Sequence, residues 1–336
     1  MAREPFDAAA RHGKVVVHAS RNGDGLDGHQ VPLQVRHGPR KARESRNPGT
    51  TSGRPAPLRV VPYGRPLRAR DPGVGNPAML SPPTTIPRAA LVTGGAKRLG
   101  RAIALALAEA GFSVAVHCRS SRMEAEAAAT EVRARGRAAA VFAADLADEG
   151  AVAALLPAAS AALGPIGVLV NNASTFERDE WHDATRTGWD RHVEPNLRAP
   201  FVLMQAFARA LPTEAEGVVL NLLDQRVLSL TPHFVSYTVS KAGLWTLTQT
   251  MALALAPRIR VCAIGPGPAL PSARQTPEQF ARQAAAVPLG HGTSPEEVAF
   301  AALAILSLPS FTGQMLALDG GQHLQWGSVS TGRVAE

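Results

Sequence analysis

A tyrosine and a lysine four residues apart form the pair with the clearest chemical potential in this sequence. Tyr237 and Lys241 begin an apolar-periodic segment that predicts a helix, so both side chains should share one face. A phenol with a pKa near 10 needs a shift of roughly three units, about 4 kcal/mol, to exchange protons at neutral pH. One ammonium some 4 to 5 Å away supplies about 3 to 4 kcal/mol at an effective dielectric of ~20. The spacing therefore predicts that Tyr237 is a general acid activated by Lys241; the alternative is an ordinary helix surface.

A carboxylate precedes this pair at the end of a strand-like segment. Asp224 directly follows the apolar run at 217–223 and stands thirteen residues before Tyr237. This placement predicts that Asp224 lies beside the phenol. The alternative is that Asp224 only caps a loop.

A glycine-rich segment far upstream predicts a dinucleotide site. Thr93 to Gly100 lies between a predicted strand and a predicted helix, where Gly94 and Gly100 allow a tight turn. The helix N-terminus then offers free N–H groups to a pyrophosphate, although a glycine pattern of this kind also arises by coincidence. The next strand ends at His117 without the acidic residue that would favour NAD, and Arg119 and Ser120 follow. A cation and hydroxyls suit a 2′-phosphate, which predicts NADP(H) rather than a solvated loop.

These residues need a scaffold, and the pattern of the chain predicts one. From Arg88 onward, short apolar runs alternate with alanine-rich helical patterns, which is typical of βαβ units around a parallel sheet. We therefore expect one doubly wound α/β domain of about seven strands over 81–328. The expected strands are 89–92, 113–117, 138–143, 166–170, 217–223, 259–264 and 315–318, and the expected helices are 98–110, 121–135, 149–163, 185–211, the helix of Tyr237, and 295–308. A mobile substrate-covering loop is expected at 269–287.

Composition limits the class of protein. The 336 residues are 45% hydrophobic and contain no apolar run long enough for a membrane span, so a soluble protein without a membrane partner is expected. The two cysteines, Cys118 and Cys262, lack metal-ligand spacing. We expect neither a disulfide nor a metal, and a reduced cytoplasmic location.

The excess of positive charge is confined to the first part of the chain. Residues 1–80 hold 14 basic and 6 acidic side chains, whereas 81–336 hold 21 of each. The first 80 residues are rich in Arg, Gly and Pro and lack periodicity, which predicts disorder. A basic arm for nucleic acid and translation starting at Met79 are the alternatives, and 329–336 is expected to be a frayed tail. The neutral remainder offers no electrostatic footprint for nucleic acid.

At this point the chain resembles the short-chain dehydrogenase/reductase family over nearly all of 88–324. The resemblance implies a sheet order of 3-2-1-4-5-6-7, a homotetramer and an active site in which Lys241 also binds the nicotinamide ribose and Asn196 helps to hold a relay water. The cofactor-binding residues that it implies are Gly94, Lys97, Arg98, Leu99, Gly100, His117, Arg119, Ser120, Asp145, Leu146, Asn172, Ala173, Ser174, Tyr237, Lys241, Pro266 and Gly267.

Two departures from the usual family pattern indicate a subgroup. Arg98 replaces the usual second glycine of the turn, and Asp224 replaces the usual serine thirteen residues before the tyrosine. Together with Asn-Ala-Ser-Thr-Phe at 172–176, they resemble the pteridine reductases. That resemblance implies that Arg98, Ser174, Phe176, Asp224 and Tyr237 bind the substrate.

Charge chemistry favours the same substrate class. An ionised carboxylate would repel the alkoxide formed from a ketone, whereas it can accept a hydrogen bond from a pterin N–H group or return a proton to it. The sequence therefore predicts NADPH-dependent reduction of a pterin or dihydropterin, with dihydrofolate as a further possible substrate. Reduction of a ketone or a 3-oxoacyl group is the runner-up, and a non-catalytic sensor of dinucleotides is a remoter alternative.

Overall fold

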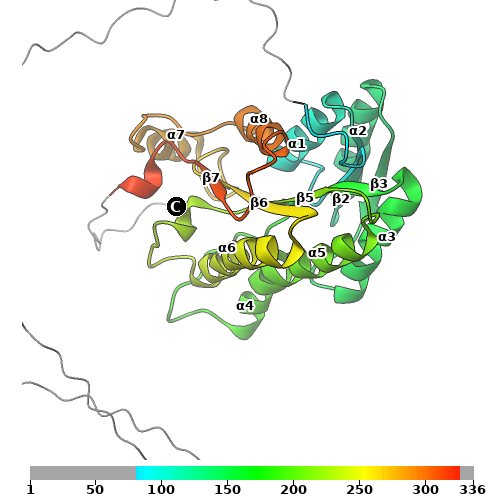
Figure 1. Cartoon of the computed structure of the whole chain (residues 1–336). Coiled ribbons are helices and arrows are strands. Elements are labelled where there is room, and N and C mark those ends of the chain that lie inside the picture. The colour runs from blue at the N-terminus through cyan, green and yellow to red at the C-terminus, as the bar shows by residue number, and fades with distance from the viewer. Residues whose placement is uncertain (1–80, 326–336) are drawn as a thin grey trace, which may run out of the picture. The chain divides into compact units, whose positions relative to one another are not determined.

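The computed structural model describes residues 81–325 (Figure 1). The predicted disorder of 1–80 and the predicted tail at 329–336 lie outside these residues, as do 326–328. The strands are β1 (Ala89–Val92), β2 (Ser113–Cys118), β3 (Ala139–Ala143), β4 (Ile166–Asn171), β5 (Gly217–Leu222), β6 (Ile259–Pro266) and β7 (Met315–Leu318). The helices are α1 (Arg98–Glu109), α2 (Arg122–Ala134), α3 (Glu149–Leu163), α4 (Arg186–Val193), α5 (Ala199–Ala210), α6 (Val235–Leu255), α7 (Pro277–Ala285) and α8 (Pro295–Leu306).

Within the described residues, the strands form one seven-stranded parallel sheet in the order β3-β2-β1-β4-β5-β6-β7. The predicted fold and strand order are thus confirmed. The chain reverses its direction of winding between β1 and β4, and the carboxyl ends of strands on both sides of such a point form a crevice. This crevice brings together the loops that follow β1, β2, β3, β4 and β5.

Helices cover both faces of the sheet because successive strand residues point to opposite sides. On β1, Ala90 and Val92 pack in one core with α1, α2 and α8, whereas Ala89 and Leu91 pack in another with α3 and α5. Figure 1 shows these two helical layers above and below the sheet. Because both faces are buried, the central strands are apolar except near their carboxyl ends, where Asn171 of β4 donates a hydrogen bond to Asn221 of β5 at 2.9 Å.

The predicted helix at 185–211 is interrupted near its middle. A π-helical turn at Glu194–Arg198 separates α4 from α5, and it contains the buried Asn196. Such a turn inserts one extra residue per hydrogen-bonded ring and often lies at functional sites. The apolar pattern predicted the helix, but it could not show this local change of winding.

The expected substrate-covering loop contains a helix, α7. This helix begins after Thr276, whose hydroxyl accepts a hydrogen bond from the Gln279 N–H, while the Gln279 side chain accepts one from the Thr276 N–H. None of the helices between residues 81 and 325 is long and apolar enough to cross a membrane.

Candidate active site

A groove of about 530 Å³ lies at the carboxyl ends of β1 to β4. It contains most of the residues predicted to bind the cofactor, which come from four separate segments of the chain. Those that line it are Gly94, Lys97, Arg98, Leu99, Gly100, His117, Arg119, Ser120, Asp145, Leu146, Asn172, Ala173 and Ser174. The structure therefore brings the predicted dinucleotide residues together in one groove.

The glycine turn requires its glycines for steric reasons. Gly94 has a φ of +62°, and a Cβ on Gly100 would lie 2.3 Å from the Gly94 carbonyl oxygen. The Asn172 side chain donates hydrogen bonds to the carbonyls of Thr93, at 2.9 Å, and of Gly94, at 3.2 Å. The turn is thus held close to the end of β4, which fits the close approach of a pyrophosphate to backbone N–H groups.

The His117 side chain hydrogen-bonds to the backbone of this turn. Its Nδ1 accepts a hydrogen bond from the Gly94 N–H at 3.1 Å, so its Nε2 carries the proton and donates to the Ala144 carbonyl at 3.0 Å. Burial lowers the pKa of His117, against the opposing effects of the Ala144 hydrogen bond and of Asp145. The ring is therefore neutral and fixes the backbone of the groove, while its predicted contact with cofactor stays a prediction.

The catalytic residues predicted from spacing meet at the end of β5. The Tyr237 hydroxyl donates to Asp224 Oδ2 at 2.9 Å, and Asp224 Oδ1 accepts the Arg226 N–H at 2.8 Å. Asp224 therefore lies beside the phenol, as predicted, and it also caps a short 3₁₀ turn at Gln225–Val227.

Lys241 is buried directly behind the phenol. Its Nζ donates to the Leu222 carbonyl at 2.7 Å and lies 5.9 Å from the centre of the Tyr237 ring. Burial lowers the pKa of Lys241 to about 8, and the nearby Asp224 carboxylate opposes this shift. The ammonium is thus held by a strand-end carbonyl at one fixed distance from the tyrosine.

Both polar atoms of the Asn196 side chain form hydrogen bonds. Its Nδ2 donates to the Thr175 carbonyl at 2.9 Å and to Ser240 Oγ at 3.1 Å, and its Oδ1 accepts the Thr175 N–H at 2.8 Å. Asn196 therefore fixes the loop that follows β4, immediately before Phe176. The predicted part of Asn196 in holding a relay water stays a prediction.

Two segments distant in the sequence are joined beside Tyr237: the loop at 174–184, and residues 228–236, which end in the first turn of α6. The Asp179 carboxylate accepts hydrogen bonds from the N–H and hydroxyl of Ser236, and the Asp179 carbonyl accepts the Phe234 N–H at 2.9 Å. The buried His192 contacts Ser236 Oγ through Nδ1 at 2.7 Å and accepts the Glu177 N–H through Nε2 at 3.0 Å. We call Asp179, His192 and Ser236 the loop clamp.

The loop clamp holds an aromatic cluster in place. The Phe176 and Phe234 rings stack at 4.7 Å, and the Phe176 ring meets the Tyr237 ring edge to face at 4.7 Å. The guanidinium groups of Arg226 and Arg274 lie 4.9 to 5.5 Å from the centres of the two phenylalanine rings. Sequence patterns identified Phe176 but missed Phe234 and both arginines, because nothing in the local spacing shows which loops pack together.

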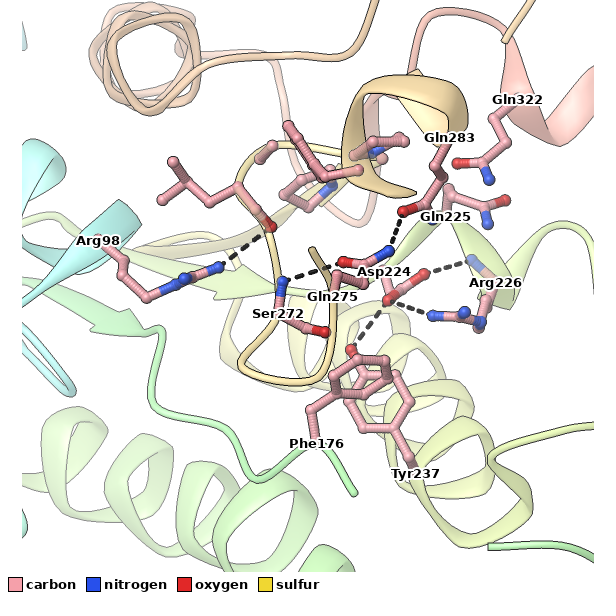
Figure 2. Close-up of a pocket in the computed structure, with 16 residues that line it drawn as sticks. Arg98, Phe176, Asp224, Gln225, Arg226, Tyr237, Ser272, Gln275, Gln283 and Gln322 are labelled. Atoms are coloured by element: carbon pink, nitrogen blue, oxygen red, sulfur yellow. Dashed lines mark hydrogen bonds and ion pairs between the residues drawn. The ribbon is translucent and has the colours of Figure 1, made fainter. Parts of the chain in front are cut away.

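A second cavity of about 150 Å³ has Tyr237 in its walls (Figure 2). Its walls include the predicted residues Arg98, Phe176, Asp224, Tyr237, Pro266 and Gly267. Ser174 lines the cofactor groove instead. Sequence reasoning missed a group of glutamines in these walls, namely Gln225, Gln275, Gln283 and Gln322.

Arg98 belongs to both the groove and the cavity. It adopts a left-handed backbone conformation, with a φ of +53°, at the place where a glycine would be unstrained. Its guanidinium donates to the carbonyls of Pro271 at 2.9 Å and Leu270 at 3.2 Å. The cofactor turn is thereby tied to the loop that covers the cavity.

The described residues contain no group of three or more His, Cys, Asp or Glu side chains placed to hold a metal ion. Cys118 and Cys262 are buried free thiols, and burial raises the pKa of Cys262 to about 11.

The known proteins that this chain resembles in sequence or structure include several oxidoreductases. A family model described as Enoyl-(Acyl carrier protein) reductase matches residues 94–323. The chain is 34% identical to 3beta-hydroxysteroid dehydrogenase 1 of Eggerthella lenta, over 70% of this chain and 93% of that protein. It is 31% identical to the 3-oxoacyl-[acyl-carrier-protein] reductase FabG of Staphylococcus aureus, over 70% of this chain and 98% of that protein.

One similar solved structure is the FolM alternative dihydrofolate reductase 1 from Brucella canis, complexed with NADP. It has a TM-score of 0.70 and 47% sequence identity, and the match covers 74% of this chain and 98% of that chain. The residues that the family model matches, 94–323, include Gly94 to Gly100 of the glycine turn, the loop clamp and the Tyr237 helix. The chain therefore belongs to the short-chain dehydrogenase/reductase family of oxidoreductases.

Proposed function

We propose that this oxidoreductase uses NADPH to reduce a C=N bond of a pterin or dihydropterin. The contact between Asp224 and the Tyr237 hydroxyl carries the proposal, because a carboxylate there suits a substrate that presents N–H groups. The similarity to an alternative dihydrofolate reductase, at 47% identity, supports it.

The cofactor assignment rests on the groove. Arg119 and Ser120 follow β2 at its wall, where a guanidinium and a hydroxyl fit a 2′-phosphate, and the Brucella canis relative is a complex with NADP. Gly94 and Gly100 leave room for a pyrophosphate beside the N-terminus of α1. When bound, the cofactor supplies a hydride to the ring carbon of the C=N bond.

Residues of the chain supply the proton that the reduction requires. Tyr237 donates a proton from its hydroxyl to the substrate nitrogen, and Asp224, hydrogen-bonded to that hydroxyl, aligns it. Below about pH 8 the Lys241 ammonium is charged, so it stabilises the phenolate that remains. Phe176 covers the flat ring, and Arg98 faces its polar edge.

Reduction of a ketone or 3-oxoacyl group is the second candidate, because the hydroxysteroid dehydrogenase and FabG are relatives at 34% and 31% identity. The two candidates separate on charge, since the Asp224 carboxylate would oppose an alkoxide forming at the same place. A homotetramer, a cytoplasmic location and the roles of the individual site residues stay predictions.

One assay distinguishes these reactions. NADPH oxidation is followed with dihydrobiopterin, dihydromonapterin, dihydrofolate and an acetoacetyl thioester. Turnover of a pterin substrate is expected, and turnover of the thioester alone would rule the pterin proposal out. Asp224→Ser should slow pterin reduction more than any ketone reduction; an equal loss on both would make Asp224 a structural residue.

A further inference from the structure

Arg226 contacts both oxygens of the Asp224 carboxylate. Its backbone N–H donates to Asp224 Oδ1 at 2.8 Å, and its guanidinium Nη1 lies 3.5 Å from Asp224 Oδ2. The side chains of Arg226 and Asp224 are 13% and 17% exposed, so dissolved ions screen this pair only weakly. Figure 2 shows the pair in the wall of the cavity, with Arg98 on the opposite side of Asp224. A full positive charge is therefore held next to the carboxylate that contacts Tyr237.

Aromatic rings help to fix the position of this charge. The Arg226 guanidinium lies 5.0 Å from the centre of the Phe234 ring and 5.5 Å from the centre of the Phe176 ring. A guanidinium at such distances is attracted by the negative charge of the ring faces. The Phe176 ring in turn meets the Tyr237 ring edge to face. The packing of the rings thus links the place of the guanidinium to the place of the phenol.

Three charged groups act on the Tyr237 phenol. After Tyr237 gives up its proton, the Lys241 ammonium, 5.9 Å from the ring centre, favours the phenolate. Asp224 Oδ2, 2.9 Å from the phenol oxygen, opposes the phenolate, because two negative charges then lie side by side. Lys241 and Asp224 therefore act against each other. A second positive charge beside Asp224 shifts the balance back toward proton donation.

Other arginines around the cavity are directed to backbone carbonyls. Arg98 donates to two carbonyls of the covering loop, and Arg274 donates to the Phe176 carbonyl at 3.1 Å. These two side chains join loops to one another, whereas Arg226 joins the carboxylate of Asp224.

We propose that Arg226 is a positioning residue that balances the charge of Asp224, so that a carboxylate can contact Tyr237 without suppressing proton donation. This inference rests on the proposed function, in which Tyr237 donates the proton. Asp224 Oδ2 remains a hydrogen-bond acceptor within the pair, so it still suits a substrate N–H group and offers no donor to an alkoxide. Arg226 thus acts through Asp224 and not through contact with the substrate.

Two substitutions at this position separate charge from shape. Arg226→Met and Arg226→Lys both remove the planar guanidinium and keep the backbone N–H that bonds to Asp224, but only lysine keeps the positive charge. With the pterin substrate, Arg226→Met should lower kcat about tenfold while KM changes less than about threefold. In the same assay of NADPH oxidation, Arg226→Lys should keep kcat within about threefold of the unmodified enzyme.

A double-mutant cycle with Asp224→Asn tests whether Arg226 acts through Asp224. The amide keeps the size of the carboxylate and removes its charge, so Arg226 has no charge left to balance. In this background Arg226→Met should lower kcat less than about twofold, against about tenfold when Asp224 is present. Arg186→Met, which breaks an exposed pair with Asp190, is the matched control and should leave kcat and KM unchanged.

Thermal unfolding and NADPH binding verify that each variant is folded. Should Arg226→Met fail to fold, Arg226→Gln, which is neutral but polar, takes its place in both comparisons. Should Asp224→Asn be inactive, the comparison of the neutral variant with Arg226→Lys decides by itself.

The outcomes that contradict the inference are distinct. An equal loss of kcat with methionine and lysine would show that the charge of Arg226 has no role, and an equal loss with and without the Asp224 charge would show that Arg226 does not act through Asp224. A rise in KM with kcat unchanged would mean that Arg226 binds the substrate directly. If the thioester is reduced and the pterins are not, the proposed substrate is wrong, but the same cycle run with the thioester still decides the part of Arg226.

Discussion

The cofactor groove and the substrate cavity are bounded in different ways. Around the groove, side chains at the ends of parallel strands hold the backbone of the glycine turn, as where the His117 and Asn172 side chains hydrogen-bond to Gly94. Around the cavity, side chains from separate loops and helices contact one another, as in the loop clamp and the stacked rings of Phe176 and Phe234. The first arrangement depends on where neighbouring strands end, whereas the second depends on how distant segments pack together, so the two regions should respond differently to mutation.

The largest expected effect is at the point where the two regions meet. Tyr237→Phe removes the hydroxyl that contacts Asp224, and turnover with any accepted substrate should fall by about 10²–10⁴-fold because the general acid is lost. NADPH binding, measured by fluorescence titration, should remain within a few-fold. Turnover within tenfold of the unmodified enzyme would show that another group supplies the proton.

Cofactor choice tests the groove alone. Arg119→Asp should weaken NADPH binding about 100-fold and leave NADH bound equally well or better, because a carboxylate repels a 2′-phosphate and accepts from ribose hydroxyls. The same charge change at the exposed Arg209, on α5, should have no effect on either cofactor. Equal turnover of the unmodified enzyme with NADPH and NADH would contradict the assignment.

The loop clamp tests the cavity alone. Asp179→Asn weakens the contacts to Ser236, so we expect the KM for the pterin to rise about tenfold and the free energy of unfolding to fall by about 1–3 kcal/mol. The Kd for NADPH should change less than twofold. Asp190→Asn, in an exposed pair with Arg186, is the matched control. A parallel loss of NADPH binding would mean that the two regions are not independent.

The smallest effect concerns pH, since each region contains one buried histidine. Burial lowers the pKa of His117 and of His192; around His192, Asp179, the Gly188 carbonyl and Glu177 oppose this and Arg191 reinforces it. Below about pH 6.5 the unfolded chain therefore binds protons that the folded protein does not. The free energy of unfolding should fall as the pH drops from 6.5 toward the folded pKa values, by at most about 1.4 kcal/mol per pH unit for each histidine.

Urea unfolding between pH 5.5 and 7.5 measures this slope. His192→Asn should reduce it, whereas His182→Asn, at an exposed position, should not. If His192→Asn leaves the slope unchanged, His117 in the groove carries the pH dependence.

The difference between the two regions also explains what the sequence revealed. The strands and the glycine turn were predictable because apolar runs and glycine positions are local signals, whereas the strand order and most of the thirteen residues of the groove wall followed from the resemblance to the family. Tyr237, Lys241 and Asp224 were predictable from local signals too, since one helix and one strand end place all three.

The rest of the site depends on contacts between segments far apart in the sequence. His192 and Ser236 are 44 residues apart, and Gln225 faces glutamines from α7 and from the turn after β7. No spacing rule connects such positions. Arg98 was recognised by its place in the motif, but its hold on the Leu270 and Pro271 carbonyls, 172 and 173 residues away, was not.

The π turn at Glu194–Arg198 lies between side chains that have different partners, so the number of residues from α4 to α5 decides whether all of these contacts can form. On its N-terminal side His192 points to Ser236, within it Asn196 points to Thr175, and beyond it Phe207 packs in the core beneath the sheet. Each residue of helix corresponds to a rotation of about 100°, so removing one residue before Asn196 would turn His192 away from its partner while α5 stayed in place. Deleting or inserting one residue in this segment should therefore disturb the site more than replacing a single side chain.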